Sequence, residues 1–417
     1  MGFRAAKPCK SRLCAAAGQQ NYAQVLATLG VNPVLKEVQN VIAAEKCRLP
    51  DSDSFPALLL TMIALSGEFP IALSRRLSDS RSYADFAIKR LKHDDLIRTY
   101  YRNGLRGLRL TAQAKKLLAA KQPDRFLPLF TGSTMTSTPK YTIVHRLRLH
   151  RMAEVLVAMF HAGVSVYPWE KPQVFSPTTL AAEPAIERPT YYSARELKNL
   201  GLMTNRIRGS RCAGILLANG DIFAAYSTGT SEMQWENKAE MRLRSLLQIE
   251  LCQYRLPAQF MNAKQHGILF AADMTLLPAM AGVESDKRQS YFLTGESFKH
   301  FHFLTCDHHG DVVLRLLCDL DRRAALDGIL SEDLAPADPG FVVENDAMED
   351  GSPALFAYTC DVPRIKSFDG GLMLHGLTGT LYCFDFQEDA LRQMCVADIE
   401  FRCIEFDEYE RGYFHPA

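Results

Sequence analysis

The residues best suited to chemistry in this chain are cations and neutral hydrogen-bond donors concentrated between positions 78 and 118. Arginine and lysine bind phosphate oxygens through charge and hydrogen bonds, and serine, tyrosine and asparagine add neutral contacts. Two groups of such residues are predicted to face outward, one from a helix and one from a hairpin: Arg81, Ser82, Tyr83, Lys89 and Lys92, and then Arg102, Asn103, Arg106 and Arg109. Together they predict a surface that fits double-stranded DNA.

The apolar residues among these cations predict the helix that must position the first group. Ala84, Ala87, Ile88 and Leu91 recur at helical spacing, so one face of the helix would be buried and the other exposed. Ser80 or Asp79 is suited to cap its first turn. Residues near the start of such a helix are best placed to reach base edges in a major groove.

Elements on both sides of this helix complete a small motif. A helix over 55–65 and a short one after Pro70 precede it, and strands over 96–101 and 108–110 follow. The order predicts a winged helix-turn-helix within residues 50–120, a fold that places one helix in the major groove and a basic hairpin on the flanking phosphates.

The tip of the hairpin is predicted to span residues 102–107. Gly104 and Gly107 are expected to supply positive φ angles there, because glycine adopts them at little cost. The hairpin arginines would then contact phosphates, which position a protein without reading the DNA sequence.

Other features leave a second interpretation of this motif open. Winged helices also serve protein contacts and dimerisation, and Asp85, Asp94 and Asp95 lie near the cations. The acidic residues argue against a purely electrostatic grip on DNA. A homodimer also stays open.

Charge is distributed unevenly along the 417 residues, although the net charge is only +1. Residues 1–150 hold 24 Lys and Arg against 10 Asp and Glu, whereas residues 331–417 hold 5 against 18. A basic end suits nucleic acid, and an acidic end suits protein contacts or solubility. The pattern favours DNA as one partner and a protein as a second, through the acidic region.

Composition shifts predict five segments and a mixed α/β (α+β) chain. Residues 1–49 are a basic tail with helices, 50–120 the winged helix-turn-helix, and 121–140 a linker rich in proline, serine and threonine. Residues 141–330 form an α/β domain, and 331–417 an acidic α/β extension that begins with a polar linker.

The larger domain has its own order of predicted elements. An amphipathic helix opens it, two apolar runs about an Asn-Gly predict a hairpin over 214–229, and a helix over 237–250 follows. Several apolar strand candidates come next, among them residues 301–306 and 312–320.

This order resembles the α-β-β-β-α-β core of restriction-endonuclease-like folds. On residues 78–111 and 211–230, the chain resembles the replication-relaxation family of bacterial mobile and conjugative elements. Members of that family join an N-terminal winged helix to a nuclease-like domain, and are linked to plasmid replication. The resemblance implies the same two-part architecture here.

The resemblance also implies where metal-binding acids of an active nuclease would stand. Ala213 and Gly214 occupy the place of the Pro-Asp pair, and Tyr226 and Thr228 occupy those of the later motif residues. None of these side chains is a carboxylate that could hold the divalent cation activating water. We therefore expect a degenerate domain, with no catalytic residue, metal ligand or cofactor.

Three nearby glutamates, Glu232, Glu236 and Glu240, are assigned to the start and solvent face of the following helix, and Asp221 to the hairpin turn. A histidine-rich stretch over 300–311 could bind zinc if its groups converged, but a solvated turn after a strand explains it better.

The sequence therefore predicts a DNA-binding protein of a mobile or conjugative element, acting in replication or its control. Its longest nearly uncharged apolar stretch has 12 residues, too few to span a bilayer, and no signal peptide is recognised, so a cytoplasmic location is expected. Two alternatives remain: a metal-dependent nuclease, and an interaction scaffold whose winged helix contacts protein.

Overall fold

The structure, a computed structural model, describes residues 48–131, 142–175, 183–207, 209–233, 235–281, 289–290 and 298–414. It is mixed α/β, as predicted, and its main sheets have three, five and five strands. The helices predicted before position 48 and most of the 121–140 segment lie outside the described residues.

The N-terminal part is mostly helical and carries the three-stranded sheet, whose order is β1-β3-β2. Its elements are α3 (Phe55–Ser66), β1 (Phe69–Pro70), η1 (Ala72–Arg75), α4 (Arg81–His93), β2 (Ile97–Arg102), β3 (Leu105–Leu110), α5 (Ala112–Lys121) and α6 (Pro123–Phe130). The predicted helices and hairpin strands of residues 50–120 are thus confirmed as elements. The predicted linker is wrong over Pro123–Phe130, since these residues form α6 and its Phe126 and Leu129 are buried.

The central part is built on a five-stranded sheet of order β10-β8-β6-β5-β4. Strands β4, β5 and β6 pair antiparallel, and β6, β8 and β10 pair parallel. Its elements are α7 (Ile143–His161), β4 (Thr190–Ser193), η2 (Glu196–Ile207), β5 (Gly214–Ala218), β6 (Asp221–Gly229), β7 (Trp235–Glu236), α8 (Asn237–Leu247), η3 (Gln248–Arg255), α9 (Pro257–Phe260), β8 (Gln265–Ala271), α10 (Leu276–Ala281), β9 (Gln289–Ser290), β10 (Phe301–Thr305), α11 (His308–Cys318) and α12 (Leu320–Leu330).

The predicted hairpin is confirmed in this sheet. Strands β5 and β6 are joined at Asn219 and Gly220, whose φ angles of 55° and 76° are those of a type I′ turn. The strand predicted over 312–320 is wrong, because these residues lie mainly in α11. Asp307 caps that helix by accepting a hydrogen bond from the Gly310 amide at 3.1 Å, and apolar side chains all around it are buried.

The C-terminal part holds the other five-stranded sheet, of order β11-β12-β13-β14-β15. Its elements are β11 (Ala335–Pro336), β12 (Ala347–Glu349), β13 (Ser352–Phe356), α13 (Val362–His375), β14 (Gly379–Phe384), α14 (Asp385–Met394), β15 (Ile399–Ile404) and α15 (Phe406–Phe414). The polar linker predicted at its start is in part β11 and β12, which pair with each other at the sheet edge.

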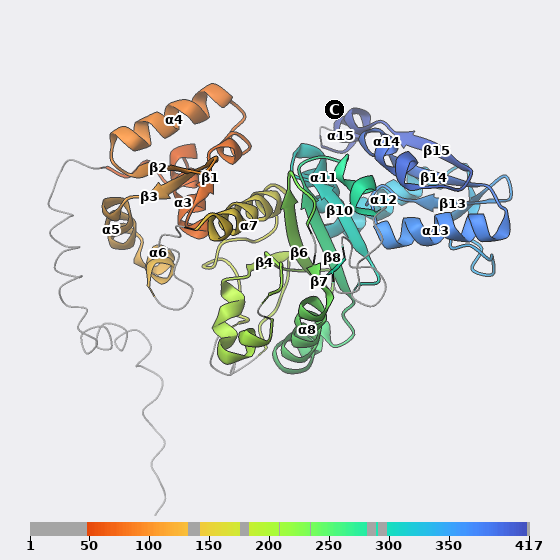
Figure 1. The fold of residues 1–417 in the computed structure, drawn as a ribbon, viewed down its shortest axis with the longest axis horizontal. Helices are drawn as coiled ribbons and strands as arrows, with labels where there is room; N and C mark the ends of the chain where they lie inside the picture. Colours follow the sequence, from red (N-terminus) through yellow and green to blue (C-terminus); the bar gives the residue numbers. More distant parts are fainter. Residues whose placement is uncertain are drawn as a thin grey trace, which may run out of the picture.

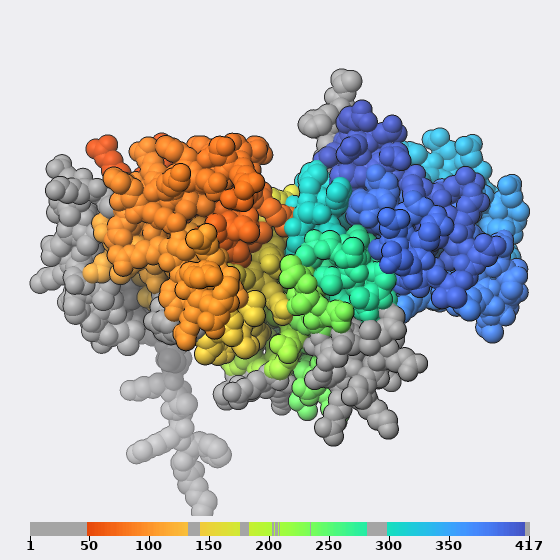
Figure 2. Space-filling view, turned by 45° about the horizontal axis from the view of Figure 1, so that its top comes forward, coloured from red at the N-terminus to blue at the C-terminus, as the bar shows by residue number. Residues whose placement is uncertain are grey.

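Helix α7 joins the N-terminal and central parts (Figure 1). Buried side chains of α3, of the β1–β3 sheet and of α7 belong to one hydrophobic core that continues into the central sheet. The C-terminal sheet lies at the other end of the molecule from α4 (Figures 1 and 2). Within the described residues, no helix combines the length and apolarity that a membrane span needs.

Candidate nucleic-acid interface

Helix α4 presents the first predicted group of residues on its outer face. The Ser80 hydroxyl caps the helix by accepting a hydrogen bond from the Tyr83 amide at 3.3 Å. The predicted inner stripe of Ala84, Ala87, Ile88 and Leu91 is buried, which fixes the rotation of the helix. The opposite side is exposed, and it includes all five predicted residues: Arg81, Ser82, Tyr83, Lys89 and Lys92.

Two acidic side chains of the α4 region lie close to arginines. Asp85 is half-buried and lies 3.6 Å from Arg75, and Asp94 lies 3.9 Å from Arg90. Aromatic side chains share the outer face, where Tyr83 is 45% and Phe86 is 57% exposed. The face is therefore basic and partly aromatic.

The β2–β3 hairpin is tighter than predicted. Its turn consists of Asn103 and Gly104 alone, with φ angles of 49° and 79°, and β3 resumes at Leu105. Gly107 lies inside β3 opposite Tyr100 and has no positive φ, so its predicted role in the tip is wrong. The requirement for glycine there is steric, because a Cβ at Gly107 would lie 2.3 Å from Oε1 of Glu68.

Three of the four predicted hairpin residues are exposed, namely Arg102, Asn103 and Arg106. Arg109 is not placed to contact a phosphate. Its guanidinium turns inward, where Nη2 lies 2.6 Å from Oε2 of Glu68 and Cζ lies 4.1 Å from the centre of the Tyr100 ring. The prediction failed because strand alternation alone does not reveal a buried carboxylate behind the hairpin.

That carboxylate, Glu68, is fully buried between the hairpin and α7. Besides Arg109, it accepts hydrogen bonds from Arg146 at 2.6 Å and faces the His150 ring at 2.9 Å. Burial alone would raise the pKa of Glu68, but the hydrogen bonds to His150, Arg146 and Arg109 outweigh it and lower the pKa to about 2.

Arg146 is fully buried as well and ties α7 to the hairpin backbone. Its guanidinium donates to the carbonyl oxygens of Tyr100, Arg102 and Leu105 at 3.0, 3.3 and 3.1 Å. The orientation of the hairpin is therefore set by a residue of the central part. One feature of the sequence indicates this network: Arg146 and His150 are four residues apart and therefore share a helix face.

Two further contacts fix the N-terminal part against the rest. Arg76 donates to both oxygens of Asp311 at 2.7 Å, and His161 faces the same carboxylate at 2.7 Å. Arg195 donates to the Ser66 carbonyl at 2.8 Å. The exposed face of α4 and the hairpin thus belong to a part of the chain that side-chain hydrogen bonds attach to the central part.

The positions where nuclease acids would stand lie together at the ends of β5 and β6. Tyr226 is buried there and its hydroxyl donates to Glu240 at 2.8 Å. Glu240 is itself fully buried, so its predicted place on a solvent face is wrong, whereas Glu232 and Glu236 are exposed as predicted. Burial raises the pKa of Glu240, and three hydrogen bonds occupy its oxygens, from Tyr226, Ser210 and the Arg211 amide.

Asp221 and the histidines of the 300–311 stretch have structural partners. Asp221 opens β6 and accepts a hydrogen bond from the Lys264 amide at 2.7 Å. The stretch predicted to be a solvated turn begins α11 instead, with Asp307 as its cap. Across the described part of the chain, no three His, Cys, Asp or Glu side chains come close enough together to hold a metal ion.

Comparisons of the chain with protein-family models, with curated proteins and with solved structures find no match.

Proposed function

We propose that this chain is a cytoplasmic DNA-binding protein of a bacterial mobile or conjugative element, acting in replication or its control. In this proposal residues 50–120 act as a winged helix-turn-helix. The observation that carries it is the outer face of α4, where Arg81, Lys89 and Lys92 are exposed and Arg102 and Arg106 extend from the neighbouring hairpin. Cations in this arrangement match a groove bordered by phosphates.

Helix α4 would enter the major groove and the hairpin would contact the adjacent backbone. The rigid attachment of the hairpin through Arg146 supports this proposal, because a hairpin held in one orientation loses little entropy on binding. The acidic C-terminal sheet lies away from α4, so it is available for a protein partner (Figure 1).

The central part would be a nuclease-like domain without catalysis. Helix α7, the antiparallel β4–β6 strands, α8 and the parallel strand β8 follow in the order of a restriction-endonuclease-like core. The chain has no carboxylate at Ala213, Gly214, Tyr226 or Thr228. This domain would serve as a platform that orients the DNA-binding part.

The test is fluorescence anisotropy with duplex DNA from the element's replication origin, over a series of salt concentrations. Affinity should fall steeply with salt, and replacing both Arg102 and Arg106 by alanine should reduce the log–log salt slope by about 2, roughly 0.9 for each lost phosphate contact. Replacement of the exposed Arg188, which lies in the central part, is the matched control. Wild-type affinity in the double variant would refute the hairpin's role.

One observation favours a second function, binding of protein by the same face. Exposed aromatic side chains such as Phe86 are enriched at protein interfaces, and this ring stands among the α4 cations. Under this alternative, Phe86→Ala would abolish binding of a protein partner. Duplex DNA would bind only weakly to the wild type and to every variant.

A further inference from the structure

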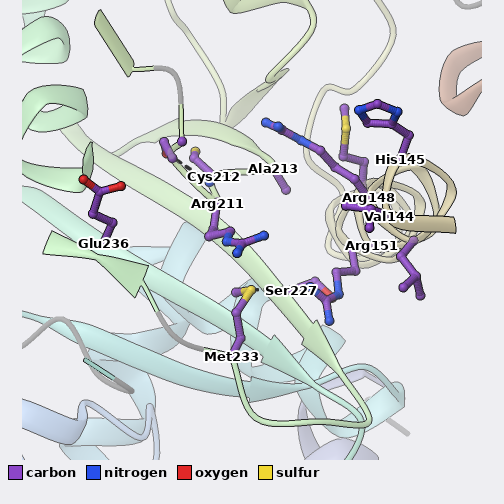
Figure 3. Close-up of a pocket in the computed structure, with 14 residues that line it drawn as sticks. Val144, His145, Arg148, Arg151, Arg211, Cys212, Ala213, Ser227, Met233 and Glu236 are labelled. Carbon is purple, nitrogen blue, oxygen red and sulfur yellow. Dashed lines mark hydrogen bonds between the residues drawn. The ribbon is translucent and has the colours of Figure 1, made fainter. Parts of the chain in front are cut away.

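A cavity of about 640 Å³ lies between α7 and the ends of β5 and β6 (Figure 3). One wall is the outer side of the first half of α7, and the other is the segment 209–213 that leads into β5. Its apolar lining comes from Val144, Leu147, Met152 and Met233. Cavities of this size are typical of small-molecule sites.

Three guanidinium groups dominate the charge of this cavity. Arg148 and Arg151 extend from α7, and Arg211 extends from the opposite wall, all into the same space (Figure 3). Neither Arg148 nor Arg211 has a side-chain hydrogen bond or ion pair with another described residue. Among the described residues, Arg151 makes one side-chain hydrogen bond, to the Met233 sulfur, which lies 3.5 Å from its Nη1.

Nearby acids offset part of this charge, since Arg211 lowers the pKa of the buried Glu240 and Glu154 raises that of Arg151. Among the described residues, however, no acid forms an ion pair with Arg148, Arg151 or Arg211. Glu154 accepts a hydrogen bond from the Ser227 hydroxyl at 2.7 Å, and burial raises its pKa. Glu236 stands across the cavity from Arg148 and Arg151 (Figure 3). Burial lowers the pKa of Arg151, Glu154 raises it, and Arg211 lowers it further, as expected for like charges facing one cavity.

We propose that this cavity binds a ligand through its phosphate groups, held by Arg148, Arg151 and Arg211. Guanidinium groups match phosphate oxygens in charge and in paired hydrogen bonds. The volume exceeds what one phosphate fills, and the apolar wall suits a base, so the ligand is a nucleotide or a short stretch of single strand. The site is separate from the proposed duplex surface, because the residues that line the cavity include none of α4 or of the β2–β3 hairpin.

A bound phosphate ligand would relieve the electrostatic repulsion between the three arginines. Three cations facing one cavity repel one another, and that repulsion destabilises the unliganded fold. Replacement of one of them by glutamine should therefore leave the unliganded protein equally stable or more stable. The same replacement should weaken binding of a phosphate ligand about tenfold or more, since each charge-assisted hydrogen bond contributes at least that factor.

The experiment measures binding of three probes to the full chain: pyrophosphate, ATP and a labelled twelve-nucleotide oligothymidylate. Arg148→Gln and Arg211→Gln should each weaken whichever probes bind, whereas Arg242→Gln, an exposed arginine on α8 outside the cavity, should not. Binding of ATP alone identifies a nucleotide site, and binding of the oligonucleotide identifies a strand site. Both outcomes support the proposal.

Other outcomes overturn it. These are no binding of any probe, equal binding by the glutamine variants, or a lower thermal midpoint of Arg148→Gln without ligand, which would show a structural role. The hairpin variant with Arg102 and Arg106 replaced separates this site from the proposed function. It should lose duplex affinity yet bind the cavity probes as the wild type does.

Discussion

Glu68 and Arg146 form an ion pair of 2.6 Å between two side chains that are both fully buried, one following α3 and the other on α7. A buried pair stabilises a fold only weakly against an apolar alternative, because desolvation opposes the attraction. Removing one partner is far more costly, since the other charge stays buried without compensation. Replacement of either residue therefore tests how firmly the N-terminal part is attached to the central part.

We expect Arg146→Met to lower the free energy of unfolding by about 3–5 kcal/mol, because Glu68 would lose one of the two arginines that lie 2.6 Å from it and three carbonyls would lose their donor. Urea unfolding followed by circular dichroism measures the change. Glu68→Gln should also destabilise, and the double variant should lose less than the two single losses added together. Strict additivity would show that the two side chains are not coupled.

The same carboxylate predicts a dependence of stability on pH. The pKa of Glu68 falls from 4.5 to about 2 on folding, so its contribution is fully present above pH 4.5 and is lost as pH falls toward 2. The contribution is on the order of 3 kcal/mol, the free energy equivalent of this shift. Thermal midpoints across pH 2–6 should fall more steeply for the wild type than for Glu68→Gln. Equal slopes would contradict the prediction.

Arg109 and Arg106 alternate on one strand and should respond differently to replacement. Arg109→Ala removes an inward ion pair with Glu68 and should lower stability by about 2 kcal/mol or more. Arg106→Ala removes an exposed group and should leave stability within about 0.5 kcal/mol while lowering duplex affinity. Parallel unfolding and anisotropy measurements compare the two. If Arg109→Ala leaves the free energy of unfolding unchanged, the Arg109 side chain of the wild type lies in solvent and not against Glu68.

The helices and hairpins of this fold were predictable where local patterns decide them. The buried stripe of α4 and the Asn219–Gly220 turn are set by neighbours within a few positions, and both were predicted from the sequence. The cap of α4 was narrowed to Ser80 or Asp79, and the structure shows Ser80. Residues 312–318 show the limit, because a continuous apolar run fits a buried strand and a buried helix equally well. The cap at Asp307 decides in favour of the helix. Its effect depends on the local backbone geometry, which the sequence pattern does not give.

The candidate sites were harder to predict, because they depend on partners distant in sequence. Glu68 meets Arg146 across 78 positions, which no local pattern reveals. Arg109 consequently looked like an outward cation. The cavity arginines on α7 and Arg211 were missed for the same reason, since only the packing of α7 against the central sheet brings them to one space.

Gly107 and Gly104 provide a final, matched prediction about the hairpin. Gly104 has a φ of 79° with open space around it, so Gly104→Ala should cost about 1–2 kcal/mol through backbone strain alone. A Cβ at Gly107 would instead meet Glu68, which cannot withdraw because Arg146, Arg109 and His150 hold it. Gly107→Ala should therefore cost more than Gly104→Ala in urea unfolding.

The cause can be isolated with a second background. In Glu68→Ala protein the opposing side chain is gone, so adding Gly107→Ala should cost little beyond the loss that Glu68→Ala itself produces. Gly104→Ala should cost the same in both backgrounds, because nothing lies near it. If Gly107→Ala is equally costly with and without Glu68, its glycine is required by the strand backbone and not by the buried carboxylate.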